Sequence, residues 1–436
     1  MKTDKASILS KDGVSYLIPF VLITSCFALW GFANDITNPM VKAFSKIFRM
    51  SATDGALVQV AFYGGYFAMA FPAAMFIRRY SYKAGVLLGL GMYAFGAFLF
   101  FPAKMTGEYY PFLIAYFILT CGLSFLETSC NPYILSMGTE ETATRRLNLA
   151  QSFNPIGSLA GMYVAMNFIQ ARLHPLDTAD RALLDEQEFE AIKDSDLSVL
   201  IAPYLAIGLV ILLMLILIRL VKMPKNGEEN HNINFVPTLK RIFTQSRYRE
   251  GVIAQFFYVG AQIMCWTFII QYGTHLFMSQ GMEEKAAEIL SQKYNIVAMV
   301  IFCISRFVCT FILRYLNAGR LLMILAVLGG VFTLGAVFLQ NIYGLYSLVA
   351  ISACMSLMFP TIYGIALKGL GEDAKFGAAG LIMAILGGSV LPPLQALVID
   401  MKTVGGLPAV NLSFLLPFIC FIVISWYGYR TIRNRW

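Results

Sequence analysis

The chain has 436 residues, of which 58% are hydrophobic and only 13% are charged, and its mean hydropathy is +0.67. This balance excludes a soluble globular protein and indicates a polytopic membrane protein. The formal net charge of +8 is explained by membrane orientation rather than by a nucleic-acid surface, because Lys and Arg collect in cytoplasmic loops.

Apolar windows of about 20 residues, the length that crosses a bilayer, predict twelve spans. In chain order they cover residues 16–44, 55–77, 83–103, 109–137, 147–173, 198–222, 248–278, 287–315, 321–340, 343–369, 373–400 and 407–430. The loops and tails placed inside hold 22 of the 33 Lys and Arg residues, and the outer loops hold 10. Both termini are therefore predicted to be cytoplasmic. The polar start and the long first span predict that no signal peptide is cleaved.

The longest inner loop, Lys222 to Arg249, divides the spans into six plus six. A short echo supports duplication, since RRYSYKAG at 78–85 and LRYLNAGR at 313–320 both precede a new apolar span. We therefore predict an all-α membrane protein with two six-helix halves, 1–222 and 248–436, related by a pseudo-twofold axis and joined by a linker at 223–247. This is the architecture of a secondary transporter with its site between the halves.

Polar residues gather near the end of the first span, at Trp30, Asn34, Asp35 and Asn38. Asp35 and Asn38 are three residues apart and share a helix face. Polar or irregular segments at membrane depth are tolerated where they line a cavity or are buried in protein, so all four are candidate site residues. The alternative is that the span ends near Asn34 and the following residues form an outer cap.

Glu127 lies in the middle of the fourth span, one helical turn before Asn131. An ionisable residue inside a span is a functional hypothesis by default. No Lys or Arg at mid-depth in the first seven spans can pair with Glu127, and a low dielectric favours its neutral, protonated form. That behaviour suits a proton-coupled carrier. The alternative is a structural acid bonded to a neighbouring helix.

Two further spans carry polar stripes at helical spacing. The seventh holds Gln255, Tyr258, Gln262 and Trp266, and the fifth holds Asn148, Gln151 and Asn154. Amides pair with sugar hydroxyls and aromatic rings cover sugar C–H faces, so these stripes favour a sugar site. The alternative for each residue is hydrogen bonding between helices. Gly157 and Gly161 have the spacing of helix packing.

Arg306 lies about two turns before the inner end of the eighth span. We interpret it as a structural clamp rather than a substrate contact, with Asp373 and Lys375 as candidate partners. Gly387 and Gly388 in the eleventh span predict either a hinge or a close helix crossing. All eight cysteines fall inside predicted spans without paired spacing, so we expect no disulfide framework and no metal site. We also expect no cofactor, and no constellation of nucleophile and base indicates an enzyme.

Several long strings resemble the L-fucose:proton symporter family of the major facilitator superfamily. They are SYLIPF (15–20), SYKAG (81–85), FLET with NP (125–132), RLNLAQSFN (146–154), AQFFYVGAQ with CW (254–266), FPTIYG (359–364) and LGEDAKFG (370–377). The resemblance implies that Glu127 belongs to a proton-handling carboxylate pair and adds Tyr363 to the candidate substrate contacts. The family's second carboxylate matches Asn38, whereas the acid of this chain is Asp35.

These observations predict a monomeric inner-membrane importer that carries a neutral monosaccharide, expected to be L-fucose, together with protons through the lipid bilayer by alternating access. The site has no mid-depth cation that a phosphorylated or carboxylated sugar would require. A glucose or galactose importer of the same family is the main alternative. A drug/proton antiporter would share the buried acid but need a larger apolar cavity, and a non-transporting sensor would need a longer soluble domain.

Overall fold

The computed structural model describes residues 10–11, 14–37, 40–50, 54, 57–176, 178–224, 235–401, 403–404 and 406–433. Among these residues eleven helices are long and apolar enough to cross a membrane, and they correspond to all the predicted spans except the fifth. The chain divides into two compact units. The N-terminal unit comprises Leu9–Met137 and Phe153–Ile233, and the C-terminal unit comprises Gly138–Ser152 and Asn234–Trp436.

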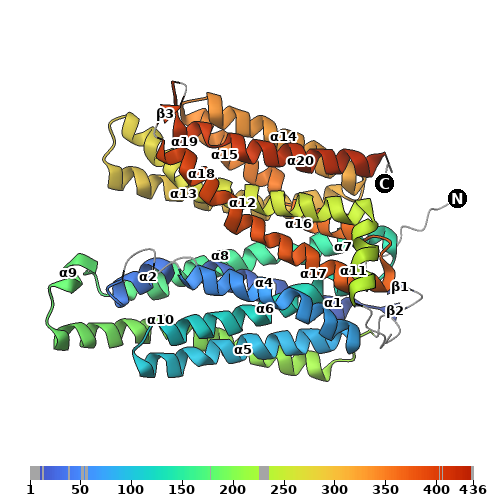
Figure 1. Ribbon diagram of the computed structural model, residues 1–436, viewed down its shortest axis with the longest axis horizontal. Helices are drawn as coiled ribbons and strands as arrows, with labels where there is room; N and C mark the ends of the chain where they lie inside the picture. The colour runs from blue at the N-terminus through green and yellow to red at the C-terminus, as the bar shows by residue number, and fades with distance from the viewer. Residues whose placement is uncertain are drawn as a thin grey trace. The chain divides into compact units, whose positions relative to one another are not determined.

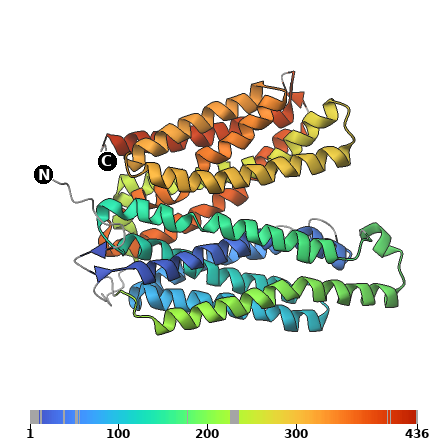
Figure 2. The same cartoon turned by 180° about the vertical axis from the view of Figure 1, so that it is seen from behind.

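The helices of the N-terminal unit run alongside one another (Figures 1 and 2). They are α1 (Leu17–Thr37), α2 (Met40–Ile47), α4 (Leu57–Arg79), α5 (Tyr82–Thr106), α6 (Tyr110–Ser136), α8 (Asn154–Val164), α9 (Thr178–Ala182) and α10 (Glu186–Leu220). A π-helix, Ala165–Ile169, and a 3-10 turn, Gln170–Arg172, continue α8, and the strands β1 (Ser10–Lys11) and β2 (Val14–Ser15) pair antiparallel. Helix α6 packs against both α4 and α5, and α1 packs against α8.

Glycines permit the close contact between α1 and α8. A Cβ at Gly157 would lie 1.8 Å from the Ala28 carbonyl oxygen, and one at Gly161 would lie 2.5 Å from the Phe32 carbonyl oxygen. Only glycine allows two backbones to approach this closely. The prediction that Gly157 and Gly161 mark a packing face is therefore confirmed.

The C-terminal unit contains the remaining helices. They are α7 (Glu140–Gln151), α11 (Phe235–Thr244), α12 (Ser246–Ser279), α13 (Glu284–Ile312), α14 (Ala318–Phe338), α15 (Ile342–Met355), α16 (Met358–Leu367), α17 (Ala374–Met383), α18 (Gly387–Asp400), α19 (Ala409–Leu412) and α20 (Leu415–Ile432). Short 3-10 turns span Gly371–Asp373 and Ala384–Leu386, and β3 (Thr403–Val404) pairs antiparallel with β4 (Leu407–Pro408).

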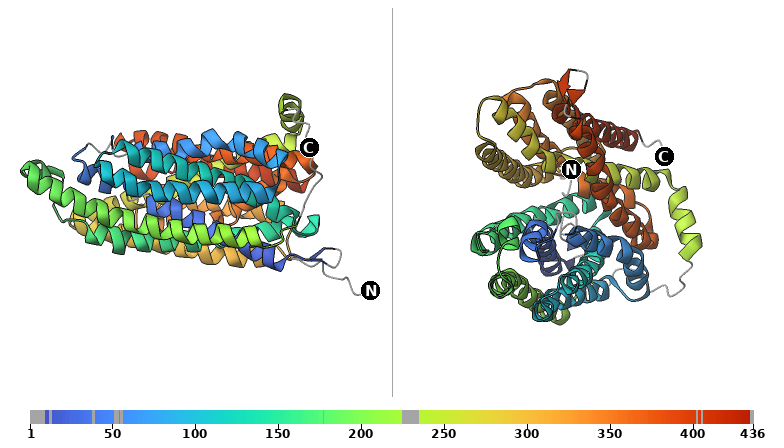
Figure 3. Two further views of the ribbon diagram at one scale, coloured as in Figure 1. Left: turned by 90° about the horizontal axis from the view of Figure 1, so that it is seen from below. Right: turned by 60° about the vertical axis from the view of Figure 1, so that its left-hand side comes forward.

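Helix α12 is the centre of the C-terminal unit, because it packs against α13, α16, α18 and α20. Figure 3 shows α11 standing apart from these helices, at the start of α12. A Cβ at Gly387 would lie 2.0 Å from the Phe256 carbonyl oxygen. The glycine pair of the eleventh span therefore serves a close helix crossing, which the sequence did not distinguish from a hinge.

The fifth predicted span, 147–173, is divided between two helices. Helix α7 ends at Gln151 and α8 begins at Asn154, directly ahead of Pro155, which has no N–H to donate to the Gln151 carbonyl. Helix α7 packs against α16 and α13, and the Asn148 side chain donates to Thr361 Oγ1 at 3.1 Å. For this reason residues 138–152 belong to the C-terminal unit, unlike the predicted division at 222 and 248.

Candidate functional site

Glu127 is buried in α6, with 5% of its surface exposed. The Tyr66 hydroxyl of α4 donates to Glu127 Oε1 at 3.0 Å, and the Tyr66 carbonyl accepts from Ser124 Oγ at 3.1 Å. Within the part of the chain that the structure describes, Glu127 forms no ion pair. A carboxyl held by a neutral phenol is able to gain or lose a proton without breaking a salt bridge.

Asn131 is also fully buried, one turn after Glu127. Its side-chain nitrogen donates to the Glu127 backbone carbonyl at 2.9 Å. The predicted shared face of the two residues is therefore present, but one amide hydrogen of Asn131 is engaged by the helix itself rather than directed to a ligand. We retain Asn131 only as a proposed contact that would require rearrangement.

Two tyrosines of α4 share one helix face. Tyr63 and Tyr66 are three residues apart, and the Tyr66 hydroxyl is the donor to Glu127 Oε1. Tyr66 is buried, whereas Tyr63 is half-buried. Neither tyrosine was predicted as a site residue, although their spacing on one face of an apolar span is visible in the sequence.

The other predicted residues of α1 differ in exposure. Trp30 is 3% exposed, and its ring lies 4.1 Å from the Phe27 ring, centroid to centroid. Asn34 and Asp35 are half-buried, and Asn38 lies outside the described residues. From α8, Asn154 donates through its side chain to the Phe27 carbonyl at 3.2 Å. In this structure Trp30 belongs to the core, whereas Asn34 and Asp35 are accessible.

The polar stripe on α12 has a buried half and a half-buried half. Gln255 and Tyr258 are fully buried, and the Tyr258 hydroxyl donates to the Met355 carbonyl at 3.2 Å. Gln262 and Trp266 are half-buried, and Trp266 Nε1 donates to Ser352 Oγ at 3.2 Å. The spacing therefore predicted a common face, but neighbouring helices cover its first half. Only its second half can reach a small ligand in this structure.

Gln255 has an additional property, since both its side-chain oxygen and its side-chain nitrogen are buried without a hydrogen-bond partner among the described residues. Gln151 and Tyr363, also predicted to contact substrate, are 4% and 0% exposed. These three side chains lie inside the C-terminal unit. Their contact with a sugar would require a movement of the surrounding helices.

Arg306 in α13 is 3% exposed and bonds backbone carbonyls. Its Nη1 donates to the Gln151 carbonyl at 2.9 Å, and its Nε donates to the Ser356 carbonyl. The prediction that Asp373 is its partner is wrong, because Asp373 forms a bidentate ion pair with Arg241 of α11 at 2.7 Å for both hydrogen bonds. Lys375 is buried and likewise gives Arg306 no described contact. The clamp is made to helix ends, whose carbonyls carry partial negative charge.

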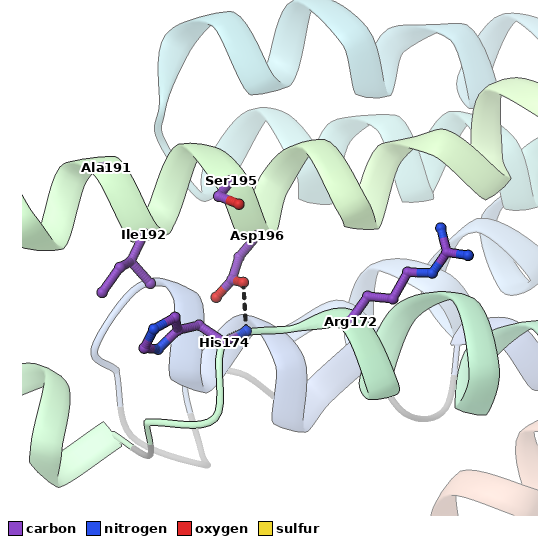
Figure 4. A pocket seen from close by; sticks show the side chains of 6 residues that line it. All are labelled: Arg172, His174, Ala191, Ile192, Ser195 and Asp196. Atoms are coloured by element: carbon purple, nitrogen blue, oxygen red, sulfur yellow. Dashed lines mark hydrogen bonds between the residues drawn. The ribbon is translucent and has the colours of Figure 1, made fainter.

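A second polar cluster lies between the fifth and sixth predicted spans, at residues 174–196. Arg181 and Asp196 form an ion pair at 2.6 Å with side chains 0% and 2% exposed. Arg181 also donates to the carbonyls of His174 and Leu176 at 3.1 and 3.0 Å. Figure 4 shows the neighbouring cavity, of about 250 Å³, where the His174 backbone N–H donates to Asp196 at 2.9 Å. It is lined by Arg172, His174, Ala191, Ile192, Ser195 and Asp196.

Comparison with known proteins gives consistent matches along the chain. The family model described as Major Facilitator Superfamily matches residues 23–393. The chain is 52% identical to the L-fucose-proton symporter of Haemophilus influenzae, covering 98% of both chains, and 34% identical to that of Escherichia coli, covering 94% and 92%. It is 30% identical to the glucose/galactose transporter of Brucella abortus, covering 95% and 94%. A crystal structure of the Escherichia coli fucose:proton symporter matches with a TM-score of 0.86 at 32% identity, covering 96% of this chain and 99% of that chain.

Proposed function

Because this chain belongs to the Major Facilitator Superfamily, we propose that it imports a neutral monosaccharide, L-fucose, together with protons by alternating access. Its membership and its spanning helices make it a multi-pass membrane transporter of the twelve-helix fold. Two relatives that cover nearly the whole chain are named L-fucose-proton symporters. We assign it a role in transport rather than catalysis, as a monomer in the inner membrane with both termini in the cytoplasm.

Glu127 is the observation that carries the proposed proton coupling. It is a buried carboxyl that accepts a hydrogen bond from the neutral Tyr66 hydroxyl, and burial without a cation favours the protonated acid. In the proposed cycle Glu127 takes up a proton from the outer side, sugar binds, the transporter changes its access, and the proton leaves to the inner side. A membrane potential supplies about 2.3 kcal/mol per charge per 100 mV, which drives accumulation.

Asp35 is the proposed second acid of this pathway. It is half-buried on α1, where an acid remains accessible to a proton. The family resemblance puts the second carboxylate at the position of Asn38 instead, three residues later in the chain. We propose that Asp35 has assumed this role in the present chain.

The proposed sugar contacts are the predicted residues that are accessible in this structure. Gln262 and Trp266 offer an amide and a flat aromatic face in the C-terminal unit, and Asn34 and Asn154 offer amides in the N-terminal unit. Amide groups pair with hydroxyls and an indole ring covers sugar C–H groups. These side chains fit a neutral sugar better than an anionic one, because none of the four is charged.

Uptake of radiolabelled L-fucose by proteoliposomes tests the proposal. An inward proton gradient is imposed without sodium, and unlabelled D-glucose or D-galactose is added as competitor. We expect accumulation above equilibrium that collapses with a protonophore and is weakly inhibited by the hexoses. Uptake that stops at equilibrium, despite an intact gradient, would refute proton coupling.

The Glu127→Gln variant separates coupling from binding. The amide keeps a similar shape but carries no exchangeable carboxyl proton, so we expect loss of accumulation while exchange of labelled for unlabelled sugar continues. Glu190→Gln is the control, since Glu190 is exposed on α10 and, among the residues that the structure describes, pairs with Lys193 at 2.9 Å. Concentrative uptake by Glu127→Gln would remove this residue from the proton pathway.

Glucose or galactose import is the second candidate, favoured by the relative from Brucella abortus. L-Fucose is 6-deoxy-L-galactose, so it differs from D-galactose in absolute configuration as well as in its methyl group. One methyl group is worth only about 1–3 kcal/mol in a pocket, so the choice of sugar depends mainly on how the ring hydroxyls are arranged. Strong competition by D-galactose or D-glucose, with weak uptake of L-fucose, would select this candidate and leave the coupling mechanism unchanged.

A further inference from the structure

Two membrane spans, the fifth and the tenth, are interrupted at a proline. The fifth span is interrupted between α7 and α8, ahead of Pro155, and the tenth is interrupted between α15 and α16, ahead of Pro360. In an α-helix each carbonyl accepts from the N–H four residues later, and proline has no N–H. The carbonyls that lose their helical donor are therefore those of Gln151 and Ser356.

Both of these carbonyls accept hydrogen bonds from one side chain. Arg306 Nη1 donates to the Gln151 carbonyl at 2.9 Å, and Arg306 Nε donates to the Ser356 carbonyl. The coincidence is specific, because the two acceptors are 205 positions apart in the chain and each stands four residues before a proline. Backbone groups left without partners are costly inside a membrane, so a donor is required at both places.

A guanidinium suits this arrangement better than other side chains. It is planar, stays charged, and presents several N–H donors at fixed angles. The Phe302 ring lies 4.5 Å from its central carbon and covers one face, while the Tyr258 hydroxyl bonds the neighbouring Met355 carbonyl. The positive charge also faces the C-terminal ends of α7 and α15, where helix dipoles favour a cation.

We infer that Arg306 is a positioning residue that replaces the two N–H donors missing at Pro155 and Pro360. It fixes α7, with Asn148 and Gln151, against α15 and α16. The chain passes from the C-terminal to the N-terminal unit directly after Ser152. A change of angle at this point breaks no helical hydrogen bond to residue 155, because Pro155 has already removed it and Arg306 has already satisfied the carbonyl.

A rescue experiment tests this assignment. Arg306→Met removes the guanidinium donor from two buried carbonyls, and we expect the thermal midpoint in detergent to fall by roughly 5–20 °C. Pro155→Ala with Pro360→Ala restores both backbone donors. We therefore expect the triple variant to recover most of the loss, although the two alanine substitutions alone leave the midpoint near that of the wild type.

Additive losses in the triple variant would overturn the inference. If Arg306→Met alone yields no folded protein, a folded triple variant is itself the rescue, and an unfolded one counts against it. Arg241→Met is the matched control, since this cation is 60% exposed and pairs with Asp373 instead; the alanine substitutions should not rescue it.

A transport assay distinguishes a positioning role of Arg306 from direct contact between Arg306 and the sugar. This assay rests on the proposed function. A positioning role predicts that the rescued triple variant binds and transports sugar with the wild-type KM. A triple variant that is folded but does not bind sugar would assign Arg306 to the substrate and overturn the inference. The expected changes in thermal midpoint do not depend on whether L-fucose is the substrate. Failure of the proposed function can therefore be distinguished from failure of this inference.

Discussion

Replacing Arg181 by Met removes one half of the buried ion pair between Arg181 and Asp196 of α10. The Asp196 carboxylate would then remain buried with the His174 N–H as its described hydrogen-bond donor. The substitution also leaves the carbonyls of His174 and Leu176 without the guanidinium donors that bond them. The segment between the π-helix and α10 therefore loses the ion pair and the hydrogen bonds through which Arg181 holds it.

The expected magnitude follows from the burial of both partners, which are 0% and 2% exposed. Removing one partner of a buried pair costs about 3–5 kcal/mol, and 1 kcal/mol shifts the thermal midpoint of a unit of this size by about 2–4 °C. We therefore expect Arg181→Met to lower the midpoint by roughly 6–20 °C. Arg181→Met with Asp196→Leu removes both charges and should recover part of this loss.

The assay is thermal unfolding of detergent-solubilised protein, followed by fluorescence-detected size-exclusion chromatography at one fixed heating protocol, because unfolding of such proteins is irreversible. Glu190→Gln on the same helix is the control. Its pair with Lys193 has a carboxylate side 52% exposed, and exposed pairs contribute about 0–1 kcal/mol. Equal midpoints for Arg181→Met and Glu190→Gln, or a double variant less stable than Arg181→Met, would refute the reasoning.

Three further predictions concern the site and its support. Gly157→Ala would place a Cβ 1.8 Å from a carbonyl oxygen of α1, so we expect a strong loss of folded protein, measured by size-exclusion chromatography against the wild type. Tyr66→Phe removes the hydrogen bond to Glu127, and a bond between neutral groups is worth about 0.5–1.5 kcal/mol; we expect the proton-driven uptake rate to fall by about 2–10-fold while binding persists. Trp266→Phe retains an aromatic ring but loses the N–H bond to Ser352, which is worth about 1 kcal/mol. We therefore expect sugar affinity to fall by about fivefold, measured by isothermal titration calorimetry.

The spans were predictable because a membrane imposes a local requirement, about 20 apolar residues in one window. Eleven of the twelve predicted spans correspond to helices long enough to cross. The division of the fifth span into two helices was not predicted, because hydropathy averages over residues and does not register one missing N–H at Pro155. The association of α7 with α16 could not be predicted either, since its contact between Asn148 and Thr361 joins positions 213 residues apart.

The sequence predicted the types of residue in the candidate site but not which of their side chains are buried. Helical spacing places Gln255, Tyr258 and Trp266 on one face of α12, but it contains no information on which neighbouring helix covers that face. The structure buries the first two and leaves Trp266 half-buried. Residue type alone likewise favours charged partners, and so it missed Tyr66, a neutral donor supplied by another helix.

The assignment of α7 to the C-terminal unit also has a consequence for biosynthesis. Arg306 follows Gln151 by 155 residues, so at about 5–20 residues per second the ribosome needs roughly 8–30 s to make the donor after its acceptor. During this interval the nascent fifth span holds a carbonyl whose final partner does not yet exist. The first six spans therefore complete their fold only after the eighth and tenth have been synthesised, and a chain divided at the inner loop would separate α7 from its partners.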